Sequence, residues 1–284
     1  MTIGVDLGAT QIRAAVCQGD QLIGRRQALL QNKDDLNKTL DQITEFIEPL
    51  IEPGTTGIGI GVPAIVDIPT GTVYNSNNIS SWQKVALKQT LEIRLSLPVH
   101  VNNDANSFTY GTYKFGLNTK CQNMVGVTLG TGLGIGLVLN GQPYFGSNCG
   151  AGEIGLNQYK GKTYELYTSS EFFTREHGLS AQEAHELARS GSEDHLMMWH
   201  MYGIHLGEFI KTAVTAYDPE VIAFGGSIAQ AFDLFEPGIR TALKDFIFQE
   251  SLKKLQFRQV ELKDVAILGA AALFDDYESK LVGV

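Results

Sequence analysis

The sequence predicts an α/β fold made of two similar domains, and three observations support this prediction. Short apolar segments have the character of strands, as at residues 2–8, which enter a glycine turn, and at residues 57–62. Segments with helical apolar spacing alternate with them, as at residues 33–52, where Pro53-Gly54 ends the pattern. Part of the first half of the chain also recurs in the second half.

Composition restricts the class of protein before any motif is considered. The chain has 284 residues, of which 43% are apolar and 19% charged, as in globular proteins. Its formal net charge of −9 argues against a nucleic-acid partner, because clustered Lys and Arg bind phosphate backbones. No secretion signal and no apolar stretch long enough for a membrane span is found, so we expect a cytoplasmic protein. The three cysteines form no CxxC pair, and no disulfide framework is indicated.

The expected elements follow in a regular order. Strands are expected at residues 2–8, 12–17 and 57–62 and from Pro98 onward. Helices are expected at residues 33–52, from Ala105, at 195–216 up to Asp218-Pro219, at 228–249 with a kink at Pro237, and from Leu268-Gly269 onward. Ser180 and Glu183 predict a capping box, and Gly191 predicts the end of that helix.

The internal repeat aligns GVDLGATQIRAAV (4–16) with GVTLGTGLGIGLV (126–138). At an offset of 122 five positions coincide, from Gly4 with Gly126 to Val16 with Val138. The strands after Pro98 and Pro219, each followed by a turn and a helix, extend the pattern. Chance agreement between Gly- and Val-rich segments is the alternative. A true duplication would place two matching turns across one ligand, in a cleft between the halves.

The turn after the first strand is a candidate phosphate site. Gly8 lets the backbone approach a phosphate, whose oxygens the amide groups and the Thr10 hydroxyl can bind. Asp6 is a candidate ligand for Mg²⁺, directly or through water. In the matching turn, Thr131 offers a second hydroxyl and Gly132 a second open backbone. An ordinary β-hairpin is the alternative interpretation of the first turn.

Three further segments carry candidate site residues. Asp104 follows the carboxyl end of a predicted strand, which is where α/β proteins bind ligands. Its carboxylate can accept a proton from an attacking hydroxyl. The alternative is that Asp104 is a helix N-cap. Gly225 and Gly226 offer a flat surface for an adenine ring, or else form a packing turn. Glu153 and Glu165 are candidate hydroxyl acceptors, or else solvated surface carboxylates.

Together these segments resemble the ROK family over nearly the whole chain. DLGAT, GVPAIVD, NNDAN, LGTGLGIGLVLNG, GAGEIG, VIAFGGS and LGAA occur in the family's order. ROK sugar kinases are hexokinase-type ATPases, so the resemblance implies duplicated RNase H-like (actin-like ATPase) domains around a central cleft. The expected boundaries are residues 1–105 for the sugar and phosphate side, joined by the C-terminal helix 269–284, and residues 106–268 for the nucleotide side and oligomerisation. A homodimer is implied as well.

The implied reaction is phosphorylation of a small-molecule sugar, a hexose or hexosamine, at O6 as in a glucokinase, with ATP and Mg²⁺ as cofactors. Asp104 is the implied base. The implied phosphate and adenosine contacts are Asp6, Gly8, Thr10, Thr131, Gly132, Gly225 and Gly226. The implied sugar contacts are Asn78, Asn103, Asp104, Glu153 and Glu165.

Several alternatives stay open within this resemblance. The acceptor can instead be N-acetylmannosamine, N-acetylglucosamine, allose or fructose. A non-catalytic sugar-sensing ROK regulator is a rival of another class. We expect no helix-turn-helix here, because the first strand is predicted to begin at Thr2 and the net charge is negative. A catalytically idle sugar-binding protein is the third possibility.

The chain departs from the family pattern at several positions. GEIGH is replaced by GEIGL, with Leu156 in the place of the histidine, and the CxCGxxGC segment is absent, so zinc is not expected. Ala9 replaces a glycine, which is tolerable only if its φ is negative. Gln11 stands where lysine is common, and Thr112 where many relatives have glutamate. The change at Thr112 has no chemical explanation.

Overall fold

The computed structural model describes residues 1–76 and 78–282. Contacts between Cα atoms divide the chain into two compact units. Unit 1 comprises Met1–Asn118, Pro143–Ala151 and Glu261–Val284, and unit 2 comprises Thr119–Gln142 and Gly152–Val260. Unit 1 therefore extends beyond the expected boundary at residue 105, and the C-terminal helix belongs to it.

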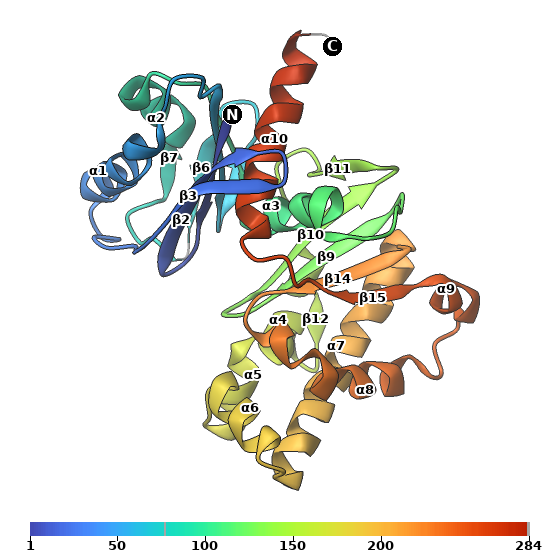
Figure 1. Ribbon diagram of the computed structural model, residues 1–284. Coiled ribbons are helices and arrows are strands. Elements are labelled where there is room, and N and C mark those ends of the chain that lie inside the picture. Colours follow the sequence, from blue (N-terminus) through green and yellow to red (C-terminus); the bar gives the residue numbers. More distant parts are fainter. Residues whose placement is uncertain (77, 283–284) are drawn as a thin grey trace. The chain divides into compact units, whose positions relative to one another are not determined.

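Unit 1 contains a five-stranded sheet with the order β3-β2-β1-β4-β8, of which β2 and β3 are labelled in Figure 1. Strand β1 pairs antiparallel with β2 and parallel with β4, and β4 pairs parallel with β8. The carboxyl ends of β1, β4 and β8 therefore lie at one edge of the sheet. The strands are β1 (Thr2–Leu7), β2 (Gln11–Gln18), β3 (Gln21–Leu29), β4 (Gly57–Val62) and β8 (Val99–Asn103).

The second large sheet repeats this topology, with the order β11-β10-β9-β14-β15. Strand β9 pairs antiparallel with β10 and parallel with β14, which pairs parallel with β15. The duplication predicted from the sequence is therefore present. The strands are β9 (Met124–Leu129), β10 (Leu133–Leu139), β11 (Gln142–Tyr144), β14 (Val221–Gly225) and β15 (Gln256–Gln259).

Two details of the predicted repeat are wrong. Leu7 pairs with Ile12, whereas Leu129 pairs with Leu133, so the second turn is one residue shorter. The offset of 122 therefore holds only up to the turn, and Val16 is equivalent to Leu137 rather than Val138. In addition, β14 occupies the position of β4 and not that of β8. Gly225 is consequently equivalent to Gly61, which pairs with Asp6 as Gly225 pairs with Thr128, and not to the Asn102–Asp104 segment.

The alternating sequence of β4 explains how unit 1 is layered. Ile58 and Ile60 point into an apolar core that also contains Ile43 and Leu91, from helices α1 (Leu36–Ile47) and α2 (Leu87–Leu95). The intervening glycines face helices α3 (Asp104–Gly111) and α10 (Val265–Val282). A Cβ atom on Gly59 would lie 1.9 Å from the Ala270 carbonyl oxygen. Only glycine lets α10 approach the sheet this closely.

The helices α3 and α10 also contact each other through glycine. A Cβ atom on Gly269 would lie 1.7 Å from the Ser107 carbonyl oxygen, and one on Gly111 would lie 2.1 Å from the Val265 carbonyl oxygen. The predicted helix start at Leu268-Gly269 is thus part of a close helix–helix crossing, although α10 begins earlier, at Val265. Unit 1 is completed by the small sheet β5 (Ile65–Asp67), β6 (Thr72–Tyr74) and β7 (Lys84–Ala86) and by short helical turns at Glu48–Leu50 and Thr112–Gly116.

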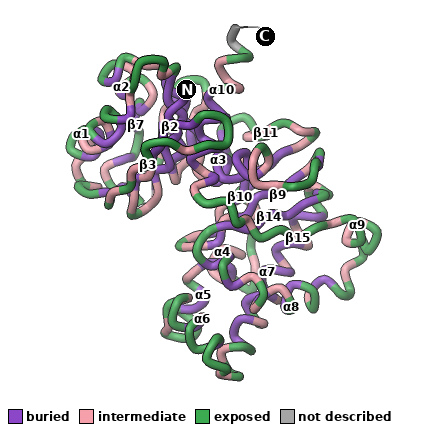
Figure 2. The backbone as a smooth tube through the Cα atoms, viewed as in Figure 1, coloured by how far each residue is buried: buried purple, intermediate pink, exposed green. Residues whose placement is uncertain are grey.

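Unit 2 has most of the remaining helices, and its central strand β14 is fully buried (Figure 2). The long helix α7 (Glu193–Tyr217) matches the predicted helix, and the capping box of Ser180 and Glu183 begins α6 (Ala181–Arg189). The other elements are the hairpin β12 (Gln158–Tyr159) and β13 (Lys162–Thr163), helices α4 (Tyr164–Thr168) and α5 (Ser170–His177), and a short turn at Glu153–Leu156.

The single helix predicted at residues 228–249 is wrong. The segment forms a short turn at Ile228–Ala231, helix α8 (Phe232–Leu243) and, after a break, helix α9 (Gln249–Lys254). Pro237 lies inside α8, so the chain does not break there. The break follows Lys244, because the Gln249 side chain donates hydrogen bonds to the carbonyl oxygens of Lys244 and Phe246. Among the described residues, no helix has both the length and the apolar character that crossing a bilayer requires.

Candidate functional site

The predicted phosphate turn of unit 1 is a tight hairpin connection. The amide of Gly8 donates to the Gln11 carbonyl oxygen at 2.8 Å, which closes the turn between β1 and β2. Ala9 is not among the residues with positive φ, so its methyl group is accommodated without strain. Thr10 is exposed, and its hydroxyl can reach a ligand. The backbone is thus the β-hairpin that the alternative interpretation describes, and phosphate binding by this turn stays a prediction.

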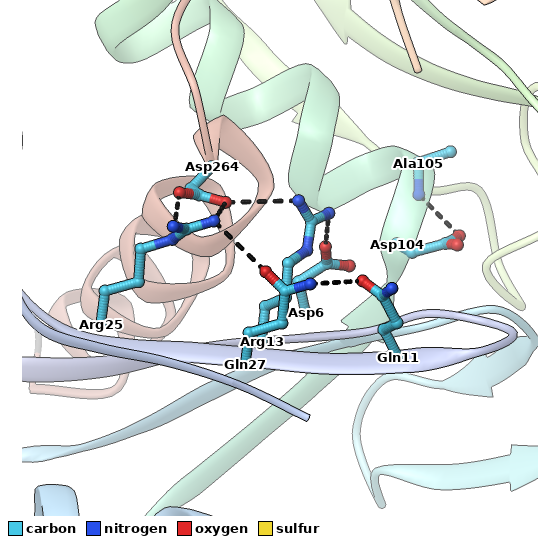
Figure 3. Close-up of polar contacts among 8 residues, drawn as sticks. All are labelled: Asp6, Gln11, Arg13, Arg25, Gln27, Asp104, Ala105 and Asp264. Carbon is cyan, nitrogen blue, oxygen red and sulfur yellow. Dashed lines mark hydrogen bonds and ion pairs between the residues drawn. The ribbon is translucent and has the colours of Figure 1, made fainter. Parts of the chain in front are cut away.

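Asp6 lies one residue before this turn and is engaged by arginine. Its carboxylate forms an ion pair with Arg13, its partner across the hairpin (Figure 3). Arg13 also contacts Asp264 at 3.3 Å, and Asp264 contacts Arg25 at 2.6 Å. Burial raises the pKa of Asp6, while the Arg13 guanidinium opposes this shift. Sequence analysis missed Arg13, although the pairing register of a short hairpin places it opposite Asp6.

This ion pair limits how Asp6 can bind Mg²⁺. Magnesium usually takes one or two protein carboxylates together with substrate phosphates and several waters. Asp6 is of the right chemical type, but direct coordination would require Arg13 to move away. The arrangement fits a water-mediated contact better. Among residues 1–76 and 78–282, no group of three or more His, Cys, Asp or Glu side chains is placed to hold a metal ion.

Asn103 and Asp104 begin helix α3 at the carboxyl end of β8. Asn103, rather than Asp104, is the N-cap: its Oδ1 accepts from the amides of Ala105 at 2.8 Å and Asn106 at 3.2 Å. The alternative interpretation of Asp104 as the N-cap is therefore wrong. Asp104 occupies the first helical position, and its Oδ1 accepts from the Ala105 amide at 2.8 Å (Figure 3).

The two asparagines expected to bind sugar in unit 1, Asn78 and Asn103, differ in exposure and in hydrogen bonding. Asn103 also donates to the Ala64 carbonyl oxygen at 3.3 Å, so much of its amide group already has partners. Asn78 is exposed and lies in a turn outside the strands and helices. Because β1 and β8 both run parallel to β4, the sheet edge that carries Asp104 also carries Asp6 and the Gly8–Thr10 turn.

The second turn, in unit 2, is bound to an acidic side chain. The Glu165 carboxylate accepts from the Leu133 amide at 3.2 Å, and a Cβ atom on Gly132 would lie 3.2 Å from the same carboxylate. The Gly130 carbonyl oxygen accepts from the Ser170 amide at 2.8 Å, which fixes the other side of the turn. Thr131 is exposed between them.

Glu153 and Glu165 form an electrostatically coupled pair in unit 2. Desolvation of the Glu153 carboxyl raises its pKa, and the negative charge of Glu165 raises it further. Glu153 begins the short turn Glu153–Leu156, which Gly152 introduces with a φ of 99°. Two carboxylates close enough to interact, one with a raised pKa, make a suitable acceptor for the hydroxyls of a polar ligand.

Aromatic side chains connect the segment after Leu156 to helix α7. Tyr159 stacks on Tyr164 with ring centroids 4.7 Å apart, and its hydroxyl lies 2.9 Å from Nδ1 of His205. Burial lowers the pKa of His205 to about 4, so the ring is neutral at neutral pH, and its tautomer sets which of the two groups donates the hydrogen bond. This cluster supports α4, which carries Glu165. Leu156 itself is exposed and packs into no core.

Gly226 is required by its backbone and borders a pocket. Its φ is 88°, and a Cβ atom there would lie 2.3 Å from the Leu129 carbonyl oxygen. Gly225 is the buried last residue of β14. Ser227, which follows Gly226, lines a pocket of about 420 Å³, a volume within the size range of small-molecule sites. Its lining comes from α6, α7 and residues 227–231: Ala181, Gln182, His185, Glu186, Trp199, Ser227, Ile228, Gln230 and Ala231.

Comparison with known proteins decides the family. The sequence matches the ROK family over residues 2–277. The chain belongs to the ROK family. Its relatives within that family include both enzymes and regulators. Glucokinase of Halalkalibacterium halodurans is 28% identical, with 98% of this chain and 96% of the relative covered. Xylose repressor of Bacillus subtilis is 25% identical, with 88% of this chain and 70% of the relative covered.

Solved ROK structures share the fold. A ROK family glucokinase from Streptomyces griseus, in complex with glucose and AMPPNP, superposes with a TM-score of 0.82 at 24% identity, covering 96% of this chain and 98% of that chain. A ROK family transcriptional regulator, a homologue of the E. coli MLC protein, gives a TM-score of 0.84 at 22% identity, covering 96% and 77%. At this identity the likeness shows the fold alone, and it confirms the predicted actin-like ATPase fold.

Proposed function

We propose that this ROK protein is a sugar kinase that transfers the γ-phosphate of ATP to O6 of a hexose or hexosamine. The observation that carries the proposal is the position of Asp104. It stands at the carboxyl end of β8, with the helix behind it capped independently by Asn103. Its carboxylate is therefore not needed as the cap and can serve as the base that accepts the proton of the attacking hydroxyl.

The sugar side of the proposal uses the polar groups near that carboxylate and the acidic pair of unit 2. Glu153 and Glu165 accept hydrogen bonds from ring hydroxyls, and Asn78 and Asn103 supply amide groups. The raised pKa of Glu153 suits a carboxyl that is desolvated further when a neutral sugar binds. Because Leu156 replaces the family's histidine, the acceptor sugar is the part of this proposal that needs a direct screen.

The nucleotide side uses the two turns and the pocket beside Gly226. Amides and hydroxyls of Gly8–Thr10 and of Thr131–Gly132 bind phosphate oxygens, and the 420 Å³ pocket takes the adenosine. Phosphoryl transfer depends mainly on positioning and charge neutralisation. Mg²⁺ supplies part of that neutralisation when bound to the nucleotide, and Asp6 would hold it through water.

A steady-state assay of ADP release tests this function. Purified protein is incubated with Mg²⁺ and ATP and, one at a time, with glucose, N-acetylmannosamine, N-acetylglucosamine, allose and fructose. We expect saturable ADP release with at least one of them. Release that is equal with and without sugar, or absent with all five, would contradict the assignment as a kinase for this group of acceptors.

A second candidate is a sugar-sensing regulator that does not catalyse. The similarity to xylose repressor favours it. Isothermal titration of the same five sugars separates the two functions. A regulator binds one of them without ADP release, whereas the kinase shows both binding and turnover.

A further inference from the structure

The turn Gly8–Thr10 is contacted by a lysine that no motif predicts. The ammonium of Lys33 lies 3.0 Å from the carbonyl oxygen of Ala9 and donates a hydrogen bond to it. Lys33 follows β3, so it is 24 residues away in the sequence, and its side chain is half-buried. A cation thus stands at the turn to which the proposed function assigns phosphate binding.

The backbone around Lys33 is held in place on both sides. The Leu30 amide donates to the Thr10 carbonyl oxygen at 2.9 Å, which ties the end of β3 to the turn. The Lys33 carbonyl oxygen accepts from the Ser81 amide at 2.9 Å and from the Ser80 hydroxyl at 3.2 Å. The side chain therefore reaches the turn from a fixed base.

The ammonium of Lys33 has capacity that the protein does not use. An ammonium has three donors, and no carboxylate of the described residues forms an ion pair with this one. The other polar groups near the turn are engaged: Gln11 accepts from Gln27 at 2.8 Å, and Arg13 contacts Asp6 and Asp264. Lys33 is thus the cation beside the turn whose charge no acid in the described chain neutralises.

The hydrogen bond also sets the direction of a phosphate donor. In a trans peptide the carbonyl and the following amide point in opposite directions. With the Ala9 carbonyl oxygen directed at Lys33, the Thr10 amide points away from it and toward the other side of the turn. The ammonium polarises this peptide and adds positive potential at short range. Both effects strengthen an anion site and do nothing for an uncharged nucleoside.

We propose that Lys33 is a positioning cation of this turn: it orients the Ala9–Thr10 peptide so that the Thr10 amide faces the polyphosphate of the bound nucleotide, and its charge on the other side of that peptide adds positive potential at the phosphates. This inference rests on the proposed function. It assigns a role to a residue outside every motif of the family pattern.

Calorimetric binding of AMPPNP and of adenosine to the full chain tests the role of Lys33 without requiring turnover. Lys33→Gln should weaken AMPPNP binding about tenfold, as expected for one partly solvated charge, and should leave adenosine binding within twofold. Lys33→Arg should recover most of the affinity. Lys38→Gln is the matched control, since it removes the same charge from an exposed position five residues away. The affinity for AMPPNP should also fall less steeply with added salt in Lys33→Gln.

The outcomes separate this inference from the proposed function. Equal AMPPNP affinity in Lys33→Gln and wild type, or equal losses for AMPPNP and adenosine, would overturn the role of Lys33 even if the wild type is an active kinase. A selective loss for AMPPNP supports the role even if no sugar is phosphorylated. An unchanged salt dependence would reduce Lys33 to a structural contact and overturn the charge argument.

Discussion

Replacing Asp104 by asparagine should separate catalysis from folding. The side chains have nearly the same shape, and the asparagine oxygen can still accept from the Ala105 amide, which Asp104 binds at 2.8 Å. Asn103 remains as the N-cap. The weakened attraction between this side chain and the helix N-terminus costs about 0.3–1 kcal/mol of stability. For a protein of this size that lowers Tm by less than about 4 °C.

The chemical consequence of Asp104→Asn is much larger. A carboxamide cannot accept the proton of the attacking hydroxyl, so kcat should fall by about 10²–10⁴-fold. Sugar affinity measured by calorimetry should stay within a few-fold, because the amide still makes hydrogen bonds. Asn103→Ala is the comparison variant, since losing the cap costs about 0.5–2 kcal/mol of stability. An Asp104→Asn enzyme that retains wild-type kcat, or that unfolds like Asn103→Ala, would refute this reasoning.

Three further predictions follow from the same structure. Gly269→Ala should lower the urea midpoint by an amount equivalent to about 1–3 kcal/mol or more, because the added Cβ would lie 1.7 Å from a carbonyl oxygen of α3. Gly150→Ala is the control and should leave the midpoint unchanged, because the nearest atom to its Cβ is 4.0 Å away. Equal urea midpoints for the two variants would refute the close crossing of α3 and α10. Burial lowers the pKa of His100 and His205 to about 4, so below about pH 6.5 these two rings bind fewer protons in the folded chain than in the unfolded chain. Their contribution to the free energy of unfolding should therefore fall as the pH decreases from 6.5 toward 4. Urea midpoints at pH 7 and pH 5 check this, and an equal pH dependence in a double His→Gln variant would contradict it. Exhaustive zinc chelation should leave kinase activity intact once Mg²⁺ is restored, since the sequence lacks the CxCGxxGC segment; activity that only zinc restores would contradict this prediction.

Local sequence patterns determined much of the secondary structure. The alternation in GIGIGV predicts a buried strand, and β4 has glycines on one face and apolar side chains on the other. Ser180 and Glu183 predict the start of α6 because a capping box is formed within one helical turn. The Gly8–Thr10 turn and the position of Asp104 at a strand end were also predictable, since each depends on neighbours close in sequence. The duplication was predictable because the two segments themselves resemble each other.

Elements with little burial or with competing local contacts were not predictable in this way. Strand β3 was missed because it is an edge strand with mostly exposed residues, and QLIGRRQAL shows no apolar alternation. The break after α8 was missed because a side chain beyond the helix, Gln249, satisfies the carbonyl oxygens that would otherwise continue the ladder. The one-residue difference between the two turns was hidden because glycine-rich segments align at more than one offset.

Only the tertiary structure decided which distant segments are in contact. The sequence by itself determined which residues have the chemistry for phosphate and sugar, including Asp6, Thr10 and Asp104. It did not show that Arg13 bridges Asp6 and Asp264 or that Lys33 reaches the Gly8–Thr10 turn, because these contacts depend on how the first strands and the start of α10 pack. Side-chain chemistry is a property of each residue, whereas charge neutralisation at short range depends on which backbone segments approach each other. In unit 1, glycines such as Gly4 and Gly59 allow α10 to approach the sheet closely.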